Sequence, residues 1–267
     1  MSGIGAISGA DPTASAHRSR LWWEIGIVLA LSVGRSAVYS VLALVQALTR
    51  TEALGDQSTS LNPGASAAEL WDVLYQFVAQ LFAFAPIALA IWLLWEPGAS
   101  AFRRIGLDVR GLRGFGRDAG AGILLVIVIG VPGLGLYLAG RALGITVQVE
   151  ASPLDSSWWT IPLLVIAAVR AGLTEEVIFI GYLFDRLRRI GWGPWTIILS
   201  TAALRGAYHA YQGFGPILGN VAMGVVFGWV YHRWGRVLPL VIAHALIDVI
   251  AFIGYPLAAT WFPALFT

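Results

Sequence analysis

The sequence contains no cysteine and no lysine, and few of its residues carry a charge. The absence of cysteine excludes disulfides, thiolate metal ligands and a cysteine nucleophile. Charged residues make up 12% of the 267-residue chain and hydrophobic residues 58%, whereas a globular protein carries roughly 25% charged residues. The net charge of +2 gives no support to nucleic-acid binding. Too little polar surface remains for a water-soluble body of this size, so we expect an integral membrane protein.

Long apolar stretches predict an all-α fold, a polytopic bundle of transmembrane helices. A spanning helix needs about 20 residues, and a helix satisfies its own backbone hydrogen bonds in hydrocarbon. We expect about seven spans on this measure, with an eighth short segment as the alternative. The expected spans are 21–48, 70–95, 118–140, 158–184, 194–212, 216–232 and 237–257.

Composition divides the chain into four parts. A Gly-, Ser- and Ala-rich stretch predicts a flexible N-terminal tail, and a short C-terminal tail is expected after the last span. Ionisable residues inside the expected spans concentrate in the last four spans, which marks that part as the candidate functional core. The four parts are the N-terminal tail 1–20, the N-terminal transmembrane helices with an Arg-rich loop 21–157, the core 158–257 and the C-terminal tail 258–267.

The distribution of arginine predicts the orientation in the bilayer. Loop 96–117, segment 185–193 and segment 233–236 hold most of the loop arginines, whereas loops 49–69 and 141–157 hold only Arg50 and Arg141. Cytoplasmic loops carry the excess of basic residues. We therefore expect a multi-pass protein of a bacterial-type plasma membrane with its N-terminus in the cytoplasm.

Ionisable residues are unevenly distributed among the expected spans. A charged side chain at the centre of a spanning helix costs about 2.5–3.5 kcal/mol on insertion scales and indicates a functional site. The first three spans hold chiefly Glu24, Arg35 and Asp72, mostly near their ends. The last four spans hold Arg170, Glu175, Glu176, Arg205, His209, His244 and Asp248.

The adjacent carboxylates Glu175 and Glu176 are the strongest candidates for acid–base chemistry. Neighbouring helix positions are about 100° apart, so both side chains can reach the edge of one cavity. The pKa values of two carboxylates held close together move apart, so that one of the two can take a proton. The alternative for Glu176 is a structural ion pair with Arg170 or Arg205.

Two histidines each have a charged residue one helical turn away. Arg205 precedes His209 by four residues, and Asp248 follows His244 by four. A carboxylate one turn from an imidazole can fix its tautomer and stabilise its protonated form, as in hydrolytic sites. The alternative is a buried histidine that only satisfies its hydrogen bonds.

A zinc site is the alternative to a metal-free one. Glu175, His209 and His244 could be ligands that leave a position open for water, although the H-E-x-x-H spacing is absent. In the metal-free case one Glu acts as general base on a water, and imidazoles stabilise the oxyanion. We favour the metal-free site, with no certain cofactor.

These residues resemble the CPBP family, which includes CAAX prenyl proteases and bacteriocin-processing (Abi) proteins. The family motifs are E-E-x-x-x-R, then F-x-x-x-H, then H-x-x-x-N or H-x-x-x-D. Here Glu175-Glu176 match the first motif, His209 the second, and His244 with Asp248 the third. The resemblance covers about residues 165–252 and implies an intramembrane endopeptidase of mainly helical fold.

Two positions depart from the family pattern. Ile180 stands where the first motif has Arg, and Arg205 stands where the second has Phe. We therefore expect Arg205 to supply the counter-charge of Glu176 from a neighbouring helix, since a guanidinium can pair with a carboxylate from either side. The alternative is a divergent member with another substrate or without activity.

The sequence thus predicts a membrane-embedded endopeptidase that acts on a membrane-associated, prenylated or CAAX-like peptide or protein. Glu175 would be the general base and Glu176 its positioning partner. His209 would orient the water or polarise the carbonyl, and His244 with Asp248 would stabilise the oxyanion. The alternatives are a proton-coupled transporter, because such residues also form proton relays, and a non-catalytic scaffold or immunity protein. The oligomeric state is left open.

The depth of the motif residues is a geometric problem for this hypothesis. At a rise of 1.5 Å per residue, His244 lies near the cytoplasmic end of span 237–257, whereas His209 lies much deeper in span 194–212. The two can meet only if one helix begins later or is displaced along the membrane normal.

Overall fold

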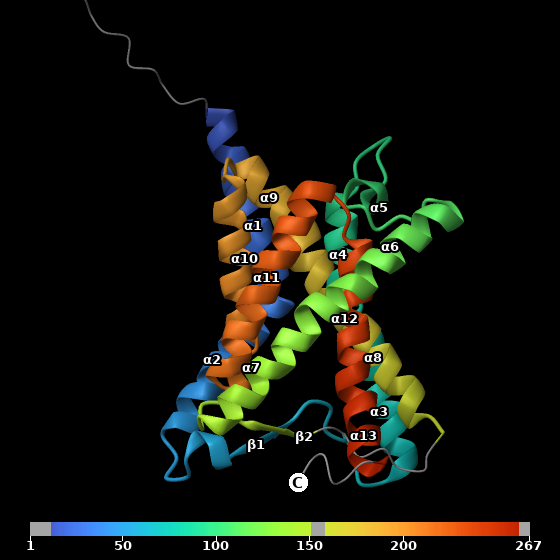
Figure 1. Cartoon of the computed structure of the whole chain (residues 1–267). Helices are drawn as coiled ribbons and strands as arrows, with labels where there is room; N and C mark the ends of the chain where they lie inside the picture. Colours follow the sequence, from blue (N-terminus) through green and yellow to red (C-terminus); the bar gives the residue numbers. More distant parts are fainter. Residues whose placement is uncertain (1–11, 151–157, 262–267) are drawn as a thin grey trace, which may run out of the picture.

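A computed structural model describes residues 12–150 and 158–261, and the described chain is almost entirely helical (Figure 1). This confirms the predicted all-α class. The α-helices are α1 Pro12–Ala30, α2 Val33–Leu48, α3 Glu69–Ala83, α4 Ala85–Leu94, α5 Ala101–Arg104, α6 Gly111–Leu125, α7 Val131–Ala142, α8 Thr160–Glu175, α9 Leu183–Ile190, α10 Pro194–Tyr208, α11 Phe214–Trp234, α12 Leu238–Val249 and α13 Tyr255–Trp261.

Short irregular segments join several of these helices into longer ones. Three are π-helical: η2 Val126–Gly130, η3 Glu176–Tyr182 and η5 Ile250–Gly254. Two are 3₁₀ turns: η1 Leu54–Asp56 and η4 Ala210–Gln212. Two three-residue strands, β1 Ser58–Ser60 and β2 Gln148–Glu150, pair in parallel at one end of the molecule (Figure 1).

Several helices are long and apolar enough to cross a membrane. Among the described residues four qualify by length and composition, namely Glu69–Leu94, Gly111–Ala142, Phe214–Trp234 and Leu238–Leu257. Helix α1 with α2 makes a fifth if this pair, bent by 57°, is one span. The protein is therefore an integral membrane protein. The count of seven stays a prediction, because α10 has only 15 residues and the α8–η3 stretch carries Arg170, Glu175 and Glu176.

The first expected span is broken in its middle. Ser32 lies between α1 and α2, and its hydroxyl donates a 2.5 Å hydrogen bond to the carbonyl of Val28. Such a bond from a serine to the residue four earlier bends a helix. The sequence pattern of 21–48 did not reveal this break, because both halves are equally apolar.

The expected tails are shorter than predicted. Helix α1 already begins at Pro12, so residues 12–20, assigned to the N-terminal tail, are helical. At the other end α13 continues to Trp261. Local helix formation continued the adjoining span in both places. Residues 1–11 and 262–267 lie outside the described part of the chain.

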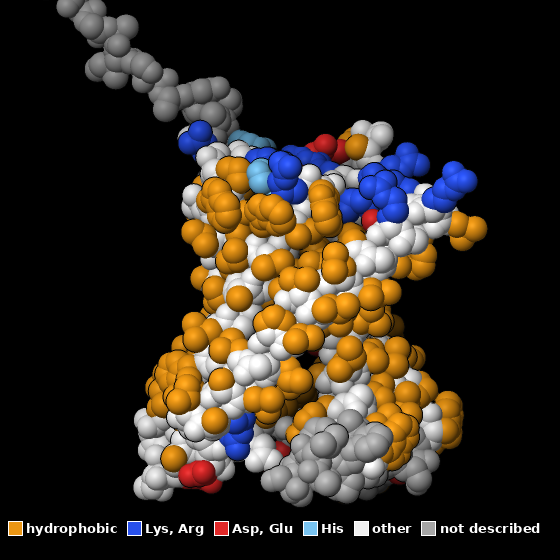
Figure 2. Space-filling model, in the orientation of Figure 1, with side chains coloured by type: hydrophobic (Ala, Val, Ile, Leu, Met, Phe, Trp, Pro, Cys, Tyr) orange, Lys and Arg blue, Asp and Glu red, His pale blue; other side chains and the backbone are white. Residues whose placement is uncertain are grey.

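The Arg-rich segments share one end of the molecule. Helix α5, the end of α9, the α11–α12 turn and the start of α1 lie at the upper end in Figure 1, where Figure 2 shows the arginines gathered. Ion pairs join these segments: Arg104 lies 2.6 Å from Asp185, and Arg236 lies 3.2 Å from Asp108. The two strands lie at the opposite end. The loops therefore divide between the two ends as the arginine distribution predicts.

Helix α8 and segment η3 lie at the centre of the bundle. Val177, Ile178 and Phe179 are fully buried there. Close helix contacts surround them: a Cβ on Gly172 would lie 3.1 Å from the amide nitrogen of Ala245 in α12, and one on Gly224 would lie 2.7 Å from the Cα of Ala202 in α10. Small residues let helices approach in this way in a membrane. They pack α8 against α12 and α11 against α10.

Candidate active site

The two adjacent glutamates lie where α8 changes into the π-helical segment η3. Glu175 is the last residue of α8 and Glu176 the first of η3, and their relative exposures are only 2% and 0%. Single π-helical turns inside α-helices are frequent at functional sites. The turn widens the helix at the two carboxylates, which is a feature that the sequence pattern did not predict.

Glu176 is bound from two neighbouring helices. Its Oε1 atom lies 2.6 Å from Nη2 of Arg205 on α10 and 2.7 Å from Nδ1 of His244 on α12. The Arg205 guanidinium lies over the rings of Phe179 and Phe227, 5.4 Å and 5.6 Å from their centroids. The contact between Arg205 and Glu176 is the one expected from the two departures in the motifs. Ile180, at the position where the family has arginine, is buried.

Glu175 is surrounded by cationic and imidazole groups but bonded to none of them. Its carboxylate oxygens lie 3.7 Å from Nε2 of His209, 3.9 Å from Nε2 of His244 and 4.0 Å from Nε of Arg205. All three distances exceed that of a hydrogen bond. Among the described residues, Oε2 of Glu175 and Nε2 of His209 are both buried and have no hydrogen-bond partner. Glu175 therefore keeps hydrogen-bonding capacity for a third group.

His209 lies at the end of α10, where the chain turns. It is the C-terminal cap of α10, and the 3₁₀ turn η4 leads from it to Gly213. Gly213 has φ +97°, and a Cβ there would lie 2.7 Å from the carbonyl oxygen of Ile145. Only glycine fits both the left-handed backbone and the close approach. This turn places the imidazole of His209 beside Glu175.

Asp248 contacts His244 less closely than the spacing suggested. Its carboxylate lies 3.7 Å from Nε2 of His244, beyond hydrogen-bond distance. Glu176 instead accepts the hydrogen bond of Nδ1. A carboxylate on Nδ1 fixes the tautomer of an imidazole, so this task falls to Glu176. Asp248 and Glu175 face the same nitrogen of His244 from two sides.

The expected difference in depth between His209 and His244 is removed by the positions of their helices. Helix α12 begins nearer the middle of the molecule than α10 does (Figure 1). His244 therefore lies deep although it is close to the start of α12 at Leu238. Both His209 and His244 consequently reach Glu175.

The donor geometry does not match a metal site. Glu175, His209 and His244 were the ligands expected for zinc. Within residues 12–150 and 158–261, no group of three or more His, Cys, Asp or Glu side chains is placed to hold a metal ion. The zinc alternative therefore lacks a fitting donor set in the described residues.

Tyr208 and Gln80 lie near the site but were not named from the sequence, and Arg170 binds Gln80 rather than Glu176. The ring of Tyr208 packs edge-on against that of His209, with centroids 4.9 Å apart. Nε of Arg170 donates a 2.9 Å hydrogen bond to the amide oxygen of Gln80 on α3, so this charged residue links α8 to α3. The aromatic residues around His209 in the sequence could have predicted the contact with Tyr208. The partner of Arg170 could not be predicted, because it depends on tertiary packing.

A comparison with protein families finds a match over the region of the site. Residues 157–250 match the family model described as Rce1-like, type II CAAX prenyl endopeptidase. The match includes both glutamates, both site histidines, Arg205 and Asp248. No curated protein and no solved structure matches the chain. The region that holds the site is therefore similar to the CAAX prenyl endopeptidases, as the motifs predicted.

Proposed function

We propose that the protein is an intramembrane endopeptidase that hydrolyses a peptide bond of a membrane-associated, CAAX-type substrate through a water activated by Glu175. The observation that carries this proposal is the unbonded, buried carboxylate of Glu175 beside two imidazoles. A general base needs a free acceptor within reach of the proton that it removes. Glu176 also has a free Oε2, but its Oε1 is held by Arg205 and His244. Its carboxylate is thus fixed in an ion pair, whereas no short contact holds that of Glu175.

In the proposed reaction Glu175 takes a proton from a water that His209 orients. The water oxygen attacks the carbonyl carbon of the scissile bond, and the carbonyl electrons move to oxygen. His244, with Asp248 beside it, stabilises this oxyanion, since donors placed at the developing charge lower the barrier. The oxyanion then collapses, the C–N bond breaks, and Glu175 returns the proton to the leaving nitrogen. Glu176 and Arg205 are positioning residues that hold His244 in place.

Replacement of the base tests the mechanism. The substitution Glu175→Gln keeps the shape of the side chain and removes its basicity. With the full chain in nanodiscs and a prenylated peptide ending in a CAAX sequence, we expect the cleavage rate to fall at least about 10²-fold. Glu52→Gln is the matched control, because Glu52 is exposed and far from Glu175 in the sequence, and it should keep the wild-type rate. A Glu175→Gln variant that cleaves the peptide at the wild-type rate would exclude Glu175 as the base.

We also propose seven crossings with the Arg-rich end in the cytoplasm. The arginines at one end of the molecule support this orientation. Because the parent chain has no cysteine, Arg113→Cys carries a single thiol in the Arg-rich segment. A membrane-impermeant maleimide should label it only in lysed cells, whereas Thr51→Cys should be labelled in intact cells. Strong external labelling at position 113 would reverse the orientation.

A further inference from the structure

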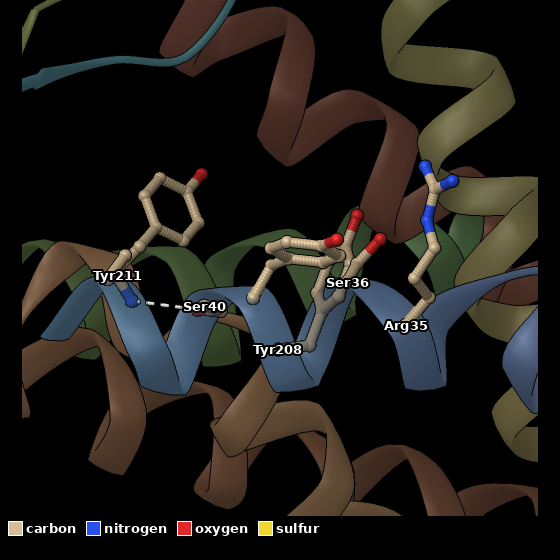
Figure 3. A pocket seen from close by; sticks show the side chains of 7 residues that line it. Arg35, Ser36, Ser40, Tyr208 and Tyr211 are labelled. Carbon is tan, nitrogen blue, oxygen red and sulfur yellow. Dashed lines mark hydrogen bonds between the residues drawn. The ribbon is translucent and has the colours of Figure 1, made fainter. Parts of the chain in front are cut away.

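A second cavity lies beside the candidate active site, between α2 and the end of α10. Its volume is about 380 Å³, and it is lined by Arg35, Ser36, Tyr39, Ser40, Tyr208 and Tyr211. Figure 3 shows the side chains of these residues, with the Arg35 side chain extending from α2. The cavity thus combines one cation with several hydroxyl groups.

Arg35 is the unusual member of this lining. It is exposed, and none of the described residues forms a hydrogen bond or ion pair with its guanidinium. It lies about midway between Leu21 and Leu48, about 20 Å along the helices from either at a rise of 1.5 Å per residue. A charge at this depth is costly and marks a functional site.

The cavity adjoins the site at the residues that flank His209. Tyr208 packs its ring edge-on against His209, with centroids 4.9 Å apart, and also lines the cavity. The backbone nitrogen of Tyr211 donates a 2.8 Å hydrogen bond to Oγ of Ser40, which holds η4 against α2 (Figure 3). A peptide bound at Glu175 and His209 could therefore extend its chain toward Arg35.

We propose that this cavity binds the C-terminal carboxylate of the peptide substrate, with Arg35 as its counter-charge and the hydroxyls of Ser36 and Tyr208 as further donors. This inference rests on the proposed peptidase function. A guanidinium binds a carboxylate through two parallel charge-assisted hydrogen bonds, and hydroxyl groups add single donors. The terminal carboxylate is the one anion that every peptide with a free C-terminus brings to this depth.

Binding of matched peptides tests the inference apart from catalysis. The probe is a prenylated CAAX peptide, made once as the free acid and once as the C-terminal amide, and titrated onto the Glu175→Gln protein in zwitterionic nanodiscs. We expect the acid to bind about 10- to 100-fold more tightly, as for hydrogen bonds to charged groups. Arg35→Gln should abolish this preference, Arg35→Lys should keep part of it, and the exposed control Arg113→Gln should leave it unchanged.

Three outcomes would overturn the assignment. The first is equal binding of acid and amide, and the second is an acid preference that survives in Arg35→Gln protein of native thermal stability. The third is loss of the preference when phosphatidylglycerol is added to the nanodiscs, which would assign the cavity to a lipid phosphate. Acid-selective binding without cleavage by the wild-type protein would instead contradict the peptidase function and leave the carboxylate site standing.

Discussion

Two clusters of charged residues in this protein differ in how completely their members are paired. The end cluster, at the Arg-rich end, consists of Glu24, Glu96, Arg104, Asp185, Arg186 and Arg189. The ion pairs among these residues are all 3.0 Å or shorter. The site cluster consists of Glu175, Glu176, Arg205, His209, His244 and Asp248, and three of its contacts to Glu175 are 3.7–4.0 Å long.

The difference separates a structural network from a functional one. The site cluster leaves Oε2 of both glutamates, Nη1 of Arg205 and Nε2 of His209 buried without a partner. A buried polar atom without a hydrogen bond is costly and calls for an explanation. The end cluster has no atom of this kind among the described residues. This difference supports the proposal that the second network keeps donors and acceptors for a substrate, whereas the first holds helices together.

The largest expected effect comes from removal of Arg205. Arg205→Ala removes the guanidinium from Glu176, a carboxylate at a relative exposure of 0% that then keeps only its contact with His244. Removal of one partner of a buried pair costs about 3–5 kcal/mol, and His244 loses its fixed carboxylate. We expect a large fall in thermal stability in detergent together with a cleavage rate below about a tenth of wild type. Stability and rate both within error of wild type would contradict the pairing.

Removal of Arg186 from the end cluster sharpens the comparison. Arg186 is buried and donates to Glu24 at 2.6 Å, to Asp185 at 2.6 Å and to the carbonyl of Leu93 at 2.5 Å. Arg186→Ala should therefore destabilise the protein by about 3–5 kcal/mol as well. The cleavage rate per folded molecule should stay within about twofold of wild type, because this network contacts no site residue. A specific loss of rate would show that the two clusters are coupled.

A smaller change in stability is expected when the arginine is moved back to its position in the family motif. Ile180→Arg with Arg205→Phe restores the family pattern and returns the counter-charge of Glu176 from its own helix. We expect the double variant to recover part of the stability lost in Arg205→Ala, with a coupling of about 0.5–3 kcal/mol between the two positions. The single variant Ile180→Arg should be harmful, because it places two guanidinium groups near one carboxylate. Additive losses in a double-mutant cycle would mean that the positions do not exchange one role.

The smallest effect is expected at Asp108, outside the membrane. Burial alone would raise the pKa of Asp108, but hydrogen bonds and charge from Arg110 and Arg236 outweigh it, so the pKa lies below the ordinary 3.8. A depressed pKa stabilises the folded state above the unfolded pKa, and this stability is lost as the pH falls through the folded value. Asp108→Asn should therefore lower stability at pH 7 by less than about 1 kcal/mol. Thermal unfolding at pH 7 and pH 3 should give a smaller difference for the variant than for wild type.

The sequence predicted the features that depend on local composition. Apolar runs predicted the helices, and the arginine distribution predicted which loops share an end of the molecule. Arg205, at the motif position of Phe, predicted the ion pair with Glu176. The break at Ser32, the π-helical turn after Glu175 and the bond from Glu176 to His244 were not predicted. These depend on how helices shift and bend against one another, which periodicity does not encode. The cavity beside Arg35 was not predicted for the same reason, since residues of separate helices form it.

The long helix Gly111–Ala142 links the site to the thickness of the bilayer. It contains 32 residues, so it is about 48 Å long, whereas the hydrocarbon core measures about 30 Å. It runs diagonally across the molecule (Figure 1), and it contacts α12 through α6 and α11 through α7. A helix longer than the membrane accommodates hydrophobic mismatch by tilting. A change of acyl-chain length would therefore shift α12, which carries His244, against α11, and we expect turnover to have an optimum in lipid chain length.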